Sequence, residues 1–85
     1  MDAFEMARLL AEKYPRNYLF RLQMADSLVS EVLALRKKKA PTAAEREQQV
    51  LSIFNSLLRD KTLDRTAIDL VNFRLNLTRQ QLAER

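Results

Sequence analysis

Hydrophobic positions recur among polar ones along this chain with the spacing of α-helices. Apolar side chains recur three and four residues apart in four successive segments, and this spacing places them on one face of a helix. The chain's two prolines, Pro15 and Pro41, separate segments, because a residue that precedes proline is driven out of the helical region. We therefore expect an all-α fold of four antiparallel helices, arranged as a helical hairpin array or a small bundle. The expected helices span approximately residues 2–13, 17–38, 43–59 and 64–83.

Several helix starts are marked by side chains that can act as caps. Asp2 and Asn17 precede the first two helices, and their oxygens can accept hydrogen bonds from free N–H groups of the first turn. The third start carries the strongest local signal, because Glu45 follows Thr42 at the spacing of a capping box. Two residues are candidate caps of the fourth helix: Thr62 and Asp64.

The fourth segment carries two apolar stripes instead of one. The first consists of Ile68, Val71, Leu75 and Leu82, and the second of Leu63, Ala67, Leu70 and Leu77. A helix that is apolar on two sides is either central in a bundle or lacks a neighbour. A chain of 85 residues makes one domain, here residues 1–85, and buries only about two-thirds of the surface of its unfolded form. A partner or a second copy would therefore add much of its stability.

Three aromatic side chains gather around Pro15: Tyr14, Tyr18 and Phe20. An aromatic cluster at the corner between two helices is more often core packing than an interface anchor. We interpret these residues as part of the core.

Three residue types are missing from the chain: cysteine, histidine and glycine. Without cysteine there is no thiol nucleophile, and without histidine the commonest general base and metal ligand is lost. Without glycine, the phosphate-binding loops of nucleotide-binding proteins are excluded. Asp60 and Asp64 flank a loop beside Arg59, Lys61 and Arg65, which predicts surface ion pairs and not a catalytic pair. We therefore expect that the protein is not an enzyme and that it has no catalytic residue, metal or cofactor.

The chain is mildly basic, with 15 Lys and Arg against 11 Asp and Glu and a net charge of +4. This charge suits an anionic partner without requiring one. No apolar run approaches the roughly 18 residues that a membrane span needs. The acidic, amphipathic N-terminal segment is unlike a secretory signal. We therefore expect a cytoplasmic protein.

The densest positive charge is the basic cluster, which consists of Arg36, Lys37, Lys38 and Lys39. The interpretation that we favour is a solvated helix end, where cations complement the negative pole of the helix dipole. The alternative is a phosphate contact, which would make the chain a nucleic-acid-binding helical domain. No aromatic residues are interleaved with the cluster for base stacking.

The fourth helix carries a continuous polar stripe that consists of Arg65, Asp69, Asn72, Asn76 and Arg79. Its simplest interpretation is the solvent-exposed face of an amphipathic helix. The alternative is a ligand groove, since asparagine amides can both donate to and accept from an extended peptide backbone. Arginines at each end would then bind carboxylates.

Part of the chain resembles the tetratricopeptide repeat, a family built from helical hairpins. Ala3, Phe4, Ala7 and Leu10, followed by Pro15, are similar to the second helix of a repeat. Met24, Ala25 and Leu28 are similar to the first helix of the next one. The pattern continues with Val50, Leu51, Phe54 and Leu57, and then with Val71 and Leu75. The chain departs from the family in lacking the glycine turn, and in having Arg21 and Asn72 where an aromatic and a small residue are usual.

The resemblance implies an antiparallel hairpin array whose concave surface binds peptides or protein partners. The groove-lining positions that it implies are Leu19, Leu22, Asp26 and Val29. About three repeats are needed for independent stability, so the resemblance implies either a fragment of a longer array or pairing with a second copy. The resulting hypothesis is a protein–protein interaction module, an adaptor or assembly subunit that binds a peptide, a helix or a second subunit.

Overall fold

The structure, a computed structural model, describes residues 2–83 and contains four α-helices and no strand in that range. The remaining positions of the expected domain, 1, 84 and 85, lie outside the described residues. The helices are α1 (Ala3–Lys13), α2 (Tyr18–Lys37), α3 (Ala43–Leu58) and α4 (Arg65–Ala83). Each end lies within one residue of the position that the apolar spacing predicts, and the all-α fold is confirmed.

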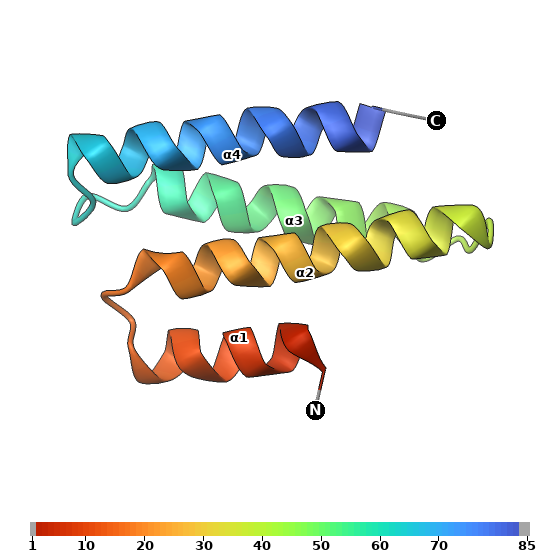
Figure 1. Ribbon diagram of the computed structural model, residues 1–85, viewed down its shortest axis with the longest axis horizontal. Helices are drawn as coiled ribbons and strands as arrows, with labels where there is room; N and C mark the ends of the chain where they lie inside the picture. The colour runs from red at the N-terminus through yellow and green to blue at the C-terminus, as the bar shows by residue number, and fades with distance from the viewer. Residues whose placement is uncertain (1, 84–85) are drawn as a thin grey trace.

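Successive helices reverse direction, so that α2 and α4 run parallel to each other and antiparallel to α1 and α3 (Figure 1). The most extensive packing is between α2 and α3, followed by α1 on α2, while α4 rests on α3 and touches α2. α1 makes such contacts with α2 alone among the described helices. The molecule is a flattened small bundle of 38 × 28 × 14 Å, with α1 and α4 at opposite edges (Figure 1).

The hydrophobic core is shared by α2, α3 and α4. Leu28 and Val32 of α2, Phe54 of α3 and Val71 of α4 have no exposed side-chain surface. These residues lie at the helical spacing that the sequence shows, so each helix buries one stripe against the other two. In α1 only Ala7 is buried, and this helix therefore adds little to the core.

Three of the proposed caps are present. The side chain of Asp2 accepts a hydrogen bond from the N–H of Glu5 at 2.8 Å, and Asn17 accepts from the N–H of Leu19 at 3.2 Å. Of the two candidates for α4, Asp64 is the cap, because its carboxylate accepts from the N–H of Ala67 at 2.8 Å. Each bond satisfies a donor that the first turn leaves free.

The capping box at the start of α3 is wrong. Thr42 makes no side-chain cap hydrogen bond, and its backbone is already helical, with φ −70° and ψ −10°. A capping side chain reaches the first-turn N–H groups from an extended backbone, which Asp2 has and Thr42 does not. The entry into α3 is instead made by the backbone, through a hydrogen bond from the N–H of Ala43 to the carbonyl of Ala40 at 3.3 Å.

α2 ends in a Schellman motif without a glycine. The N–H of Ala40 donates to the carbonyl of Leu35 at 2.9 Å, and the N–H of Lys39 donates to that of Arg36 at 3.0 Å. This geometry requires a left-handed residue, and Lys39 adopts it with φ 55°. For a residue with a Cβ this conformation costs roughly 1–2 kcal/mol, so the turn into α3 is strained.

We expect a Lys39→Gly variant to be more stable than the wild type by about 0.5–1 kcal/mol, because glycine adopts positive φ without the steric penalty. For a chain of this size the midpoint of thermal unfolding should rise by roughly 2–8 °C. Circular dichroism at 222 nm measures it. The matched control is Lys38→Gly, where φ is −86° and glycine gives no relief, so that variant should be no more stable than the wild type. Equal shifts in both variants would show that left-handed strain is not the cause.

Of the aromatic residues around Pro15, Tyr18 is half-buried and packs against the core, as the sequence predicts, whereas Tyr14 and Phe20 do not, which corrects the interpretation for these two. The rings of Tyr14 and Phe20 pack on each other with centroids 5.8 Å apart, but Tyr14 is 47% exposed. Both residues lie on the side of the α1–α2 turn, away from the core shared by α2, α3 and α4. The contact therefore fixes this turn locally.

Candidate functional site

The second apolar stripe of α4 begins in the core and ends at the surface. Ala67 is buried and Leu70 is half-buried, but Leu77 is 41% exposed and the neighbouring Phe73 is 59% exposed. Because α4 lies at the edge of the bundle, it has no further helix to cover this side (Figure 1). Of the two explanations for a doubly apolar helix, the missing neighbour applies.

A groove between α2 and α4 contains this exposed apolar surface. It has a volume of about 480 Å³, and we call it the α2–α4 groove. Its α2 wall consists of Asp26, Val29, Ser30 and Leu33, and its α4 wall consists of Phe73, Arg74, Leu77, Thr78 and Gln81. The two walls together place three large apolar side chains, Leu33, Phe73 and Leu77, around one opening.

A second hollow adjoins the first across Asp26. It lies between α1 and α2 and is lined by Ala3, Met6, Ala7, Leu10, Gln23, Asp26 and Ser27. Met6 is 54% exposed at its edge. Asp26 lines both hollows, so they form one face that crosses α2 from α1 to α4.

The charges in this face neutralise each other. The guanidinium of Arg74 donates to the carboxylate of Asp26, which joins α4 to α2 across the groove. Both side chains remain partly exposed, at 34% and 46%, so the pair contributes modestly to stability. Because these two charges are paired, the other residues that line the groove are apolar or neutral polar.

The four groove-lining positions that the repeat resemblance implies differ in how exposed they are in the structure. Leu22 is 3% exposed and Val29 is 6% exposed, so both pack in the core, although Val29 also lines the α2–α4 groove. They lie on the face of α2 that packs against α3 and α4, because this single helix must bury one stripe between two neighbours. Leu19 is 45% exposed and Asp26 lines the groove, so these two remain candidates.

The polar stripe of α4 does not line the groove. Arg65, Asp69, Asn72, Asn76 and Arg79 are all exposed, and the nearest charge pair within the stripe joins Arg65 to Asp69 at 4.0 Å. None of them belongs to the groove walls. Residues of an α-helix advance by about 100°, so a stripe through Asn72 and Asn76 faces a different side from Arg74 and Thr78. The structure therefore agrees with the simpler interpretation, a solvent-exposed helix face.

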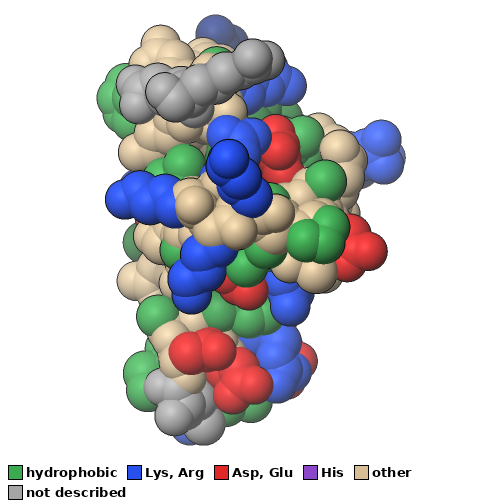
Figure 2. Space-filling view, turned by 90° about the vertical axis from the view of Figure 1, so that its right-hand side faces the viewer, with side chains coloured by type: hydrophobic (Ala, Val, Ile, Leu, Met, Phe, Trp, Pro, Cys, Tyr) green, Lys and Arg blue, Asp and Glu red, His purple; other side chains and the backbone are tan. Residues whose placement is uncertain are grey.

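The basic cluster separates into one engaged arginine and three exposed lysines. Arg36 donates to the carbonyl of Leu82 at the end of α4 and to the carboxylate of Glu47 in α3 at 2.9 Å. Lys37, Lys38 and Lys39 are exposed and take part in none of the ion pairs among the described residues. Figure 2 views the end of the molecule where α2 turns into α3, and Lys and Arg side chains stand out over it.

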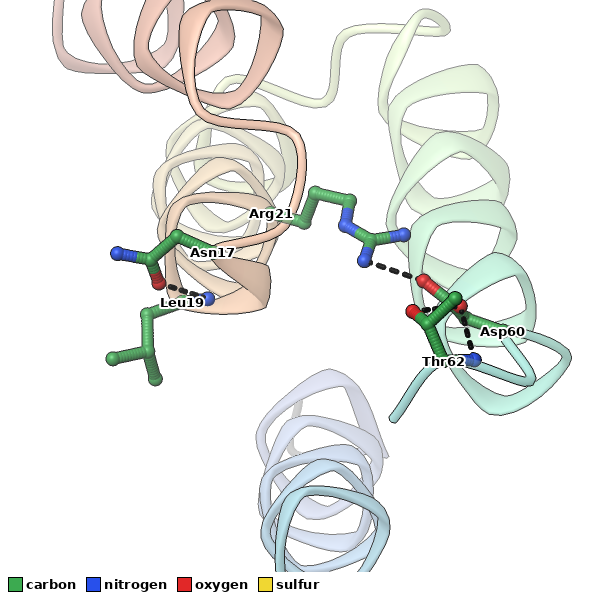
Figure 3. Close-up of polar contacts among 5 residues, drawn as sticks. All are labelled: Asn17, Leu19, Arg21, Asp60 and Thr62. Carbon is green, nitrogen blue, oxygen red and sulfur yellow. Dashed lines mark hydrogen bonds and ion pairs between the residues drawn. The ribbon is translucent and has the colours of Figure 1, made fainter. Parts of the chain in front are cut away.

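A partly buried ion pair joins the first turn of α2 to the loop before α4. The sequence does not predict it. The guanidinium of Arg21 donates to the carboxylate of Asp60 at 2.7 Å (Figure 3). The other carboxylate oxygen accepts from the N–H and the hydroxyl of Thr62, at 2.9 and 2.6 Å. Asp60 therefore pairs with a residue 39 positions away, and not with the cations beside it in the sequence.

These contacts lower the pKa of Asp60 from its ordinary value of 3.8 to about 2, mainly through the hydroxyl of Thr62 and then through Arg21. Between about pH 2 and pH 4 the unfolded chain binds a proton at Asp60 that the folded chain does not. The contribution of this group to stability is therefore present above pH 4 and lost as the pH falls toward 2.

We expect an Asp60→Asn variant to lose this pH dependence. The midpoint of urea unfolding should be measured for wild type and variant from pH 2 to pH 6. The difference between them should be largest above pH 4 and should shrink as the pH approaches 2, because the wild-type carboxylate is then protonated. The matched control is Asp69→Asn, whose carboxylate is 70% exposed and whose ion pair with Arg65 is long, at 4.0 Å. A difference from wild type that is constant over the range would contradict the assignment.

Within residues 2–83 there is no group of three or more acidic side chains placed to hold a metal ion. None of the described helices is both long and apolar enough to cross a membrane. No protein-family model, no curated protein and no solved structure matches the chain.

Proposed function

We propose that this protein is an interaction module that binds another protein through the exposed apolar faces of its helices. The observation that carries the proposal is the α2–α4 groove, in which Phe73 and Leu77 are 59% and 41% exposed. Large apolar side chains that gather around one opening mark interaction sites far more often than single exposed ones. The chemistry that this chain can offer is therefore apolar contact.

The arrangement of the helices gives this proposal further support. In a tetratricopeptide-like array the first helices of successive units run parallel and line the binding surface. The proposed resemblance assigns α2 and α4 to these positions, and the two helices run parallel (Figure 1) and form the two walls of the groove. We therefore propose the groove, whose lining includes Val29 but not Leu22, as the binding surface of such an array.

Size-exclusion chromatography with light scattering, over a dilution series from high to low micromolar concentration, tests the proposal. A mass that falls with dilution would identify a second copy as the partner, and a constant monomer mass would direct the search to other proteins through titration with helical and extended peptides. A monomer that binds neither class of peptide would contradict the proposal.

Nucleic-acid binding is the second candidate, supported by the three exposed lysines at the end of α2. The engagement of Arg36 with Leu82 and Glu47 weakens it, because the one guanidinium of the cluster is no longer free to contact phosphate. If it is correct, duplex or single-stranded probes should bind at low salt, and binding should weaken steeply as salt is added. Absence of binding at low salt would exclude it.

A further inference from the structure

We propose that the occupant of the α2–α4 groove is an amphipathic helix of another protein, with acidic residues in its first turn and running antiparallel to α2 and α4. This inference rests on the proposed function and specifies the chemistry of the partner. It follows from three properties of the groove: the kind of backbone that it can accept, the charge at one of its ends, and the direction of the helices that form its walls.

The walls favour a helix over an extended peptide. Residues 2–83 contain no sheet edge, so an extended segment could not pair its backbone N–H and C=O groups with a strand here. On the walls Thr78 is buried and Asp26 is already bonded to Arg74, which leaves Ser30 and Gln81 as the neutral polar side chains that could replace a strand. A helix satisfies its own backbone and presents apolar side chains three and four residues apart, which suits Phe73 and Leu77 one turn apart on α4.

Positive charge is not balanced by negative charge near one end of the groove. On α2, Ser30 and Leu33 line the groove, and Lys37 lies seven and four residues further on, so all three share one side of the helix. Lys37 leads to Lys38 and Lys39, and none of these lysines is in an ion pair with a described residue. A groove whose lining includes Leu33, Phe73 and Leu77, with Lys37 one turn beyond Leu33, is complementary to an apolar segment with an acidic end.

The direction of the partner helix follows from the dipoles. The hydrogen bond from Arg36 to the carbonyl of Leu82 shows that the C-terminal ends of α2 and α4 lie together, at the lysine end of the groove. Both negative poles therefore meet there, and the positive N-terminal pole of a partner is attracted to them. Acidic side chains are also favoured in the first turn of a helix, so the lysines and the dipoles select the same orientation.

The groove also sets the length of the segment. The α2 wall runs from Asp26 to Leu33, and Lys37 lies one turn beyond it; Asp26 and Lys37 are eleven residues apart on α2, which corresponds to about 17 Å at 1.5 Å per residue. A helix of about 12 residues spans this distance. Its apolar residues would contact Leu33, Phe73 and Leu77, and its first turn would reach Lys37.

The probe is a synthetic peptide of about 12 residues, cross-linked on its solvent side to hold the helix, with glutamates in the first turn and leucines at positions 4, 7, 8 and 11. The comparison peptide has the same composition with its glutamates moved to the last turn. Fluorescence anisotropy against the full chain should show at least tenfold tighter binding of the first peptide. The difference should shrink as salt is raised.

Two matched pairs of variants locate the site. Leu77→Asp should weaken binding of the first peptide at least tenfold, whereas Leu9→Asp should leave it unchanged, since Leu9 is equally exposed, at 42%, but lies on α1 outside the groove. Lys37→Glu should weaken binding severalfold, and Lys61→Glu, at the opposite end of the bundle, should not. All four variants should keep the circular dichroism and thermal midpoint of the wild type to within a few degrees, which separates loss of binding from loss of folding.

The possible outcomes separate this inference from the proposed function. Equal binding of the two peptides, or equal effects of Leu77→Asp and Leu9→Asp, would overturn the acidic antiparallel helix while leaving an apolar interaction module. Self-association that occupies the groove and blocks both peptides would also overturn it, with a second copy as the occupant. A monomer that binds no protein or peptide but binds nucleic acid through Lys37 would overturn both.

Discussion

A Phe54→Ala variant is expected to lose about 3–5 kcal/mol of unfolding free energy, the largest effect of any single truncation in this chain. Phe54 has no exposed surface and lies at the centre of the core formed by α2, α3 and α4. Its removal withdraws apolar contact and leaves a cavity that the rigid helices fill only in part. A domain of this size has only about 5–15 kcal/mol in total, so the variant should be substantially destabilised at 37 °C.

Urea unfolding at 25 °C, followed by circular dichroism, measures this loss. The matched control is Phe73→Ala, the same substitution at a residue that is 59% exposed, and its effect should stay within about 0.5 kcal/mol. The pair also separates a core position on α3 from a surface position on α4, because Phe73 is assigned to binding and Phe54 to stability. Similar losses in both variants would mean that Phe73 is packed, and the groove would then be closed.

The ends of the helices were predictable because the signals for them are local. The prolines and the caps Asp2 and Asn17 act within a few residues, and apolar spacing fixes the buried stripe of a helix whatever its neighbours are. The capping box predicted at Thr42 is absent for a reason that is also local. The backbone before it turns through Ala40 and Lys39, and this geometry overrides the preference of the threonine side chain.

The candidate site was less predictable, because it depends on which helices become neighbours. The sequence identifies two apolar stripes and one polar stripe on the fourth helix, but not which stripe faces α2. The repeat positions of Leu22 and Val29 predict a binding surface, whereas packing against two neighbours buries most of both side chains, and the groove reaches Val29 but not Leu22. The ion pairs Arg21–Asp60 and Arg74–Asp26 link residues that are 39 and 48 positions apart, and no pattern in the sequence predicts them.

We expect an Arg36→Ala variant to lose about 1–2 kcal/mol, because one guanidinium holds three helices together at the lysine end of the bundle. It donates to Glu47 of α3 and to the carbonyl of Leu82 in α4, from its own position in the last turn of α2. Charge-assisted hydrogen bonds of this kind exceed neutral ones in strength, although both side chains of the ion pair are 31% exposed and solvent reduces the gain. Without Arg36, the last turn of α4 loses its tie to α2.

The loss should therefore be local as well as global. Hydrogen exchange of the last-turn amides of α4 should accelerate more than that of the amides around Val71, which the core protects. Arg36→Lys should be intermediate, because an ammonium keeps the charge but cannot hold two acceptors in the planar fork of a guanidinium. Lys37→Ala, next to it but exposed, should change stability by no more than about 0.5 kcal/mol. If Arg36→Ala and Lys37→Ala behave alike, Arg36 is a solvated cation like its neighbours, and the phosphate-binding interpretation of the whole cluster regains its strongest residue.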